Sequence, residues 1–77
     1  MNKRRREDLS EAHGLLERAV SIVERSKEEE EDSLNNLPEN FQEGERGEVM
    51  NEVICELQSA IDSISDAMEH VDCARNS

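Results

Sequence analysis

The feature that most constrains this chain is a seven-residue repeat in its second half. From residue 54 the sequence reads ICELQSA, IDSISDA, MEHVDCA, with large apolar residues at the first and fourth places and alanine at the seventh. A spacing of about 3.5 residues is typical of a helix that packs along its length against other helices. The repeat therefore predicts a coiled-coil or bundle helix over about residues 45–74.

A weaker version of the same repeat occupies the first half. Large and small residues each recur there every seven positions: Leu9, Leu16, Val23, Ala12, Ala19, Ser26 and Ser33. Residues 24–32 (ERSKEEEED) contain no apolar side chain, but most are strong helix formers, and Leu34 resumes the apolar face. We predict one continuous helix over about residues 5–36.

The segment between the repeats, NNLPENFQEGERGE at residues 35–48, holds the only proline and the only aromatic residue. Pro38 prevents an uninterrupted helix. Residues 36–39 and 40–43 both have the Asn-x-x-Glu form of a capping box, and Gly44 and Gly47 offer backbone freedom. We expect a corner at about residues 37–44 that contains one short helical turn. Leu34, Leu37 and Phe41 are expected to fold inward and close this end.

Two helices of similar length with a short connection become antiparallel neighbours, so the predicted fold is an all-α, coiled-coil-like two-helix hairpin. We expect the small residues of both helices to meet inside the hairpin and the large stripe of the second helix to remain outside. That stripe would then form an oligomer interface in a homodimeric four-helix bundle. Its residues are Ile54, Leu57, Ile61, Ile64, Met68 and Val71. A different protein that supplies equivalent helices is the alternative.

The net charge of −11 is distributed unevenly along the chain. Residues 1–27 carry seven basic and five acidic residues, residues 28–48 carry one and nine, and residues 49–77 carry one and six. The corner is therefore the most acidic part of the chain. We therefore expect no direct binding to duplex DNA, since phosphates would meet like charge over most of the surface.

The two cysteines and the apolar pattern indicate in which cellular compartment the protein is expected. Cys55 and Cys73 are eighteen positions apart, which is roughly 27 Å along one helix and beyond disulfide reach. This favours a reducing environment. No apolar run approaches the length of a membrane span, and Glu7 and Asp8 interrupt any signal-peptide core. We expect a soluble, cytoplasmic protein without a membrane partner.

Few residues are candidates for chemistry. No nucleophile–base pair or glycine-rich phosphate loop is visible, so we expect neither an enzyme nor a cofactor. His13, His70 and Cys73 are expected near one tip of the hairpin, where they could form half a metal site. We favour solvated side chains and predict no metal. The basic cluster at residues 3–6 could bind phosphate, but a solvated terminus is the favoured interpretation.

The acidic run at residues 28–32 has two interpretations. It is a solvated helix face, or it mimics the phosphates of a nucleic acid before a protein that normally binds one. In either case the acidic corner is the predicted site of partner contact. The residues assigned to that contact are Glu28, Glu29, Glu30, Glu31, Asp32, Leu37, Phe41 and Glu45.

The segment EEEEDSLNNLPENFQ, followed by ERGEVMNEVICELQSAID, resembles small uncharacterised proteins of phages and prophages in Gram-positive bacteria. The likeness lies chiefly in the Asn-Leu-Pro-Glu corner, and Gly44 stands where a serine helix cap is expected. The resemblance implies a phage accessory protein in the host cytoplasm. Our leading hypothesis is a non-enzymatic helical homodimer that binds and inhibits a host protein, for example a defence-system component. The alternatives are an acidic nucleic-acid mimic and a purely structural assembly element.

Overall fold

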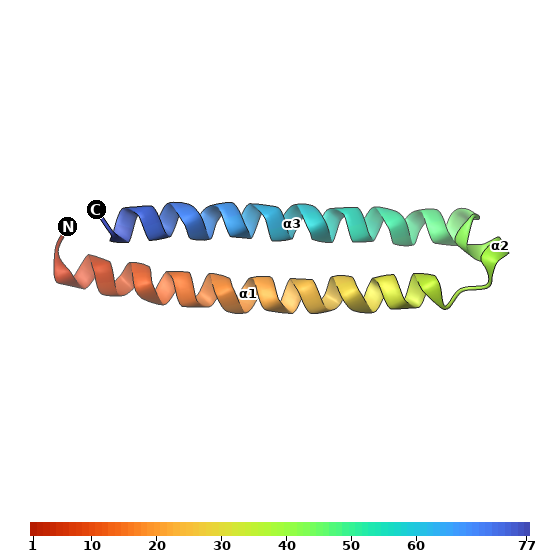
Figure 1. The fold of residues 1–77 in the computed structure, drawn as a ribbon, viewed down its shortest axis with the longest axis horizontal. Coiled ribbons are helices and arrows are strands. Elements are labelled where there is room, and N and C mark those ends of the chain that lie inside the picture. The colour runs from red at the N-terminus through yellow and green to blue at the C-terminus, as the bar shows by residue number, and fades with distance from the viewer.

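Two long helices lie side by side in opposite directions in the computed structural model, which describes residues 1–77 (Figure 1). Helix α1 spans Lys3–Asn35, the single turn α2 spans Glu39–Gln42, and α3 spans Glu45–Arg75. The molecule is a rod of 58 × 14 × 11 Å with both termini at one end. The all-α prediction is confirmed.

Helix α1 begins slightly earlier than the sequence pattern indicated. The side chain of Asn2 accepts a hydrogen bond of 2.9 Å from the backbone N–H of Arg5, which satisfies one of the free donors of the first turn. The helix then continues without a break through the apolar-free residues 24–32. High helix propensity therefore maintains the helix where the apolar pattern disappears.

The corner is closed by the side chain of Gln42, a role that no sequence pattern indicates. The amide Nε2 of Gln42 donates to the carbonyl of Leu37 at 2.7 Å and to that of Asn35 at 3.4 Å. The carbonyl of Asn35 is at the end of α1 and lacks a partner within that helix, so Gln42 satisfies it and also holds the connection after α1 at Leu37. The predicted capping boxes are wrong: Asn36 caps the C-terminus of α1 instead, and no side chain caps α2 or α3.

Gly47 is the only buried residue in the chain. A Cβ at this position would collide with the backbone carbonyl of Gln42. No glycine has a positive φ, so the corner does not use the backbone freedom that Gly44 and Gly47 offer. Gly47 is required because α3 passes so close to the corner that no side chain fits between them.

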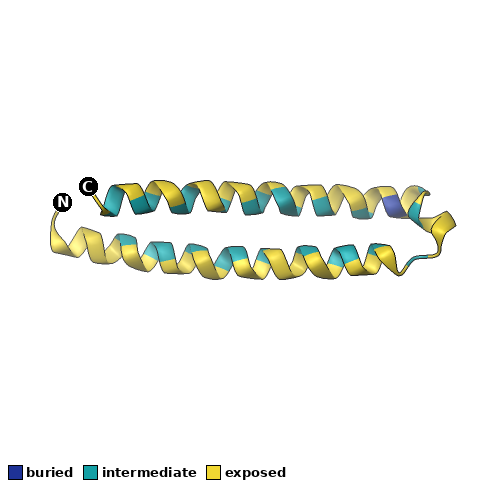
Figure 2. Cartoon of the chain, in the orientation of Figure 1, coloured by how far each residue is buried: buried dark blue, intermediate teal, exposed yellow.

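The two long helices pack through their large apolar residues. Half-buried positions occupy the facing sides of α1 and α3, and the outer sides are exposed (Figure 2). The large stripe of α3 is half-buried, so the prediction that it would lie outside the hairpin is wrong. The small residues divide into two groups: Ala12, Ala19, Ala60, Ala67 and Ala74 are also half-buried, whereas Ser26 and Ser33 are exposed. Large side chains bury more apolar area in the single available contact, so they occupy it.

No hydrophobic residue is buried, because each helix has only one neighbour along its length. Leu34 and Leu37 are half-buried near the corner, as expected, but Phe41 is 50% exposed and does not close the end of the hairpin. No helix is both long and apolar enough to cross a bilayer. The fold is thus complete in secondary structure but lacks an enclosed core.

Candidate interaction surfaces

The inner side of α1 changes character after Val23. Up to that residue its half-buried positions are alanine, histidine and aliphatic side chains, and beyond it they are Lys27, Glu30, Glu31 and Leu34. Lys27 Nζ lies 3.8 Å from Glu31 Oε1, an ion pair one helical turn apart. The contact between the helices is therefore apolar near the termini and charged on the side of α1 near the corner.

A shallow open hollow of about 280 Å³ lies between the helices in this charged region. Its lining residues are Glu24, Lys27, Glu28, Glu31, Gln58 and Ile61. Ile61 is the only hydrophobic residue among them. Ligand pockets are mostly apolar and bury most of their ligand, and this hollow does neither. It marks where long charged side chains replace a packed interior.

The five acidic residues at 28–32 do not share one face. Glu30 and Glu31 are half-buried toward α3, whereas Glu28, Glu29 and Asp32 are exposed. Consecutive helical residues turn by about 100°, so a run of five winds around the axis. The run surrounds α1 with negative charge on every side.

The other residues assigned to partner contact lie at the corner. Leu37 is half-buried, and its carbonyl is held by Gln42. Phe41 lies on α2 with half of its surface exposed, and Glu45 is exposed in the first turn of α3. Phe41 and Glu45 can therefore be reached by a partner more readily than Leu37.

The six residues assigned to the oligomer interface are all half-buried on α3. They already contribute to the contact within the hairpin, which leaves part of each exposed. The most exposed large apolar side chains on the long helices are others: Leu15 at 59%, Val49 at 55%, Ile22 at 48% and Val53 at 39%. The sequence signal for two of them was their spacing, because Leu15 and Ile22 are one heptad apart.

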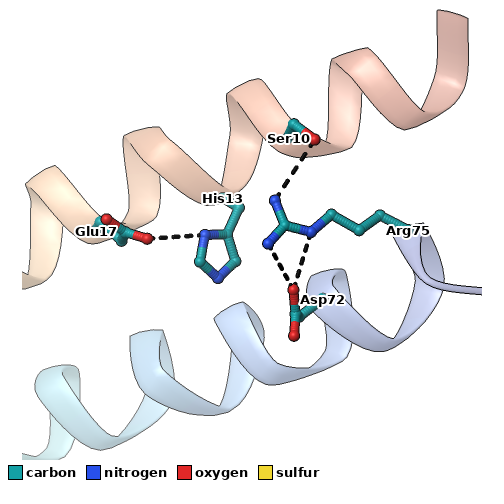
Figure 3. Close-up of polar contacts among 5 residues, drawn as sticks. All are labelled: Ser10, His13, Glu17, Asp72 and Arg75. Atoms are coloured by element: carbon teal, nitrogen blue, oxygen red, sulfur yellow. Dashed lines mark hydrogen bonds and ion pairs between the residues drawn. The ribbon is translucent and has the colours of Figure 1, made fainter.

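The tip at the termini is tied together by arginines. Arg75 donates through Nε and Nη2 to Asp72 Oδ1 at 2.9 and 2.7 Å, and through Nη1 to Ser10 Oγ at 3.5 Å (Figure 3). Arg6 Nη2 donates to the carbonyl of Ser77 at 3.3 Å. Both arginines therefore connect the start of the chain to its end.

The residues considered for a metal site do not assemble one. His13 Nδ1 lies 3.0 Å from Glu17 Oε1 on its own helix, and His70 and Cys73 are exposed. No group of three or more His, Cys, Asp or Glu side chains is placed to hold a metal ion. Both cysteines are free thiols.

Comparison with known proteins finds no matching family model, no matching curated protein and no matching solved structure. The function of this chain must therefore be inferred from its own residues and their placement.

Proposed function

We propose that this chain is a non-enzymatic interaction protein, which self-associates into a helical dimer and binds a different protein through its acidic corner. One observation carries the first part: two amphipathic helices of 33 and 31 residues bury no hydrophobic residue at all. A single hairpin leaves every large apolar side chain in partial contact with water, which is a substantial cost at about 25 cal/mol per Å². A four-helix bundle built from two hairpins reduces that cost by covering one face of each hairpin.

The second part is supported by the corner. Residues 28–48 carry nine acidic residues and one basic residue, and Phe41 is half exposed among them. An exposed aromatic within a charged surface is a common anchor in protein interfaces, where aromatic side chains contribute strongly to binding. On the strength of the resemblance of this corner to phage and prophage proteins, we propose that the partner is a host protein.

Self-association is tested by measuring mass and helicity together at micromolar concentration. Light scattering after size exclusion is expected to give twice the mass of the 8.8 kDa chain, with a circular dichroism spectrum of a helical protein. A strictly monomeric, fully helical sample would contradict the dimer.

Partner binding is tested by capture from bacterial lysate with two neighbouring variants. Phe41→Ala removes the exposed aromatic, and Asn40→Ala is the matched control on the adjacent exposed position. Loss of capture with Phe41→Ala alone is expected for an interface that recognises the shape of the corner. Equal capture by both variants would remove Phe41 from the contact.

The acidic-mimic alternative is favoured by one observation, the winding of carboxylates around α1 at residues 28–32. It predicts that capture falls steeply between low and high salt and that lysine substitutions in this run abolish it. Capture that is insensitive to salt and to these substitutions would exclude mimicry.

A further inference from the structure

The hairpin has two unlike sides that flank the contact between its helices. One side is defined by the hollow, where Glu24 and Glu31 of α1 meet Gln58 of α3. Each of these residues directly follows an inward-facing position of its heptad, namely Val23, Glu30 and Leu57. Equivalent flanks of two antiparallel helices thus lie together, and the opposite flanks must lie together on the other side of the rod.

The centre of that opposite side consists of the residues that directly precede every second inward position, and it is mostly small and uncharged. We call it the small-residue face. Its members are Ala12, Ala19, Ser26 and Ser33 of α1 and Val53, Ala60, Ala67 and Ala74 of α3. The exposed Leu15, Ile22 and Val49 border it, and Glu29 and Glu56 interrupt this border toward the corner. The side with the hollow has no comparable apolar content.

Small residues on this face allow the backbones of two helices to approach closely. On α1, Leu15 and Ile22 each stand four positions before a small residue of this face, Ala19 and Ser26 respectively. When two copies of α1 cross in opposite directions with Ile22 over the second copy's Ala19, Leu15 falls over the second copy's Ser26. Leu15 and Ile22 then each face a small residue, in both copies at once, as a two-fold axis requires.

The distribution of charge along the rod also favours two rods in opposite directions. The acidic segment 28–48 lies at the corner end of the rod, and the basic residues 3–6 lie at the other end. Two rods aligned in the same direction would bring two strongly acidic segments together. Opposed rods instead place each acidic corner beside a basic tip, which is the complementary arrangement.

The position of the basic cluster strengthens this preference. Residues 3–6 form the first turn of α1, which contains no acidic residue. The helix dipole carries positive partial charge at that end, so the cations there are unfavourably placed within their own chain. Carboxylates from a second copy, such as Glu39, Glu43 and Glu45, would be attracted by the side chains and by the helix terminus together.

We propose that a second copy of this chain docks on the small-residue face with its rod in the opposite direction, so that the acidic corner of each copy lies beside the basic tip of the other. This inference rests on the proposed self-association and specifies its face and direction. The large residues of α3 then remain between the helices of each hairpin, and Leu15 and Ile22 become buried between hairpins.

The direction is tested by a distance between two identical labels. Asn40→Cys is introduced at the corner with Cys55→Ser and Cys73→Ser, so that one spin label per chain reports on the dimer. Opposed rods place the two labels nearly a rod length apart, close to the 58 Å long dimension. Rods in the same direction place them within roughly 20 Å, the width of two helices. The short distance would overturn the proposed direction but leave self-association intact, whereas a monomer would overturn both.

The face is tested by two adjacent substitutions. Ile22→Asp places a charge on the border of the small-residue face, and Ser21→Asp places the same charge one position earlier, on the side of the hollow. Ile22→Asp is expected to weaken dimerisation by at least about tenfold, with little effect from Ser21→Asp. Equal effects of the two variants would overturn the assignment of this face.

The electrostatic contribution is tested by a charge exchange within one chain. Replacing Arg4, Arg5 and Arg6 by Glu is expected to weaken dimerisation by roughly tenfold at low salt. Adding Glu39→Lys, Glu43→Lys and Glu45→Lys to the same chain should restore it, because the complementary ends are then exchanged. Failure of the second set to restore association would show that tip and corner do not meet.

Discussion

The half of the hairpin near the termini and the half near the corner are held together by different means. Near the termini, the half-buried side of α1 that packs against the apolar stripe of α3 includes Leu9, Leu16 and Val23. Near the corner, the same stripe of α3 continues, but α1 opposes it with Lys27, Glu30 and Glu31 before Leu34. Long charged side chains can cover apolar surface with their stems while their heads reach water, at a lower gain than aliphatic packing.

The corner half compensates through backbone geometry. Gln42 donates one hydrogen bond to the last residue of α1 and one to Leu37 in the connection, and Gly47 lets α3 pass against that turn. The terminal half therefore depends on side-chain packing, and the corner half depends on how the chain turns. Substitutions at equivalent positions in the two halves should accordingly differ in their effect.

The largest effect is expected for Gly47→Ala. The new methyl group would collide with the Gln42 carbonyl, so the corner must shift, at a cost of about 1–3 kcal/mol. Gly14→Ala is the control, because nothing lies within 4 Å of a Cβ at that position. That control should gain up to about 1 kcal/mol from helix propensity. Urea unfolding followed by circular dichroism measures both, and equal stability of the two variants would contradict the steric role of Gly47.

The next effect compares packing in the two halves. Leu16 and Glu30 occupy the same heptad position two repeats apart, and both are half-buried. Leu16→Ala should cost about 1–2 kcal/mol, the lower part of the range for truncating a leucine, because the site is only partly enclosed. Glu30→Ala should change stability by less than about 0.5 kcal/mol. A comparable loss at both positions in urea unfolding would remove the distinction between the halves.

A third variant gives the corner half the aliphatic packing found in the half near the termini. Glu30→Leu places an aliphatic side chain against the apolar stripe of α3 and removes one charge from the acidic run. We expect a gain of about 1 kcal/mol, which is the partial burial of a leucine. The gain should appear as a higher urea midpoint with an unchanged or larger slope. A loss of stability would indicate that the carboxylate of Glu30 has a favourable partner, such as a second chain.

The sequence predicted the existence, type and order of the helices because the heptad repeat and Pro38 both act locally. The sequence did not correctly predict which residues lie in the contact between the helices, because that depends on how many neighbours each helix has. A repeat shows which side of a helix is apolar, but with one partner the large residues occupy the centre of the contact, and the alanines lie half-buried beside them. It also failed on Gln42 and Gly47, since their roles arise from backbone approaches that no local pattern encodes. The acidic run was visible in the sequence, but its inward-facing members, Glu30 and Glu31, were not distinguished.

The smallest expected effect on stability distinguishes the attraction within the Lys27–Glu31 ion pair from the repulsion among the acidic residues of the corner half. Lys27→Gln and Glu31→Gln both remove the 3.8 Å ion pair, which is worth about 0.3–0.5 kcal/mol on a helix surface. Lys27 is also the only cation between Arg25 and Arg46, so its loss leaves the acidic run less compensated. Losing Glu31 instead reduces the repulsion within that run.

We therefore expect Lys27→Gln to cost about 0.5 kcal/mol of stability and Glu31→Gln almost nothing at low salt. This difference should vanish near 1 M salt, where the screening length is about 3 Å. Equal costs at low salt would mean that the acidic residues do not repel one another measurably, and the charged interior would then weaken this half only by lacking apolar packing.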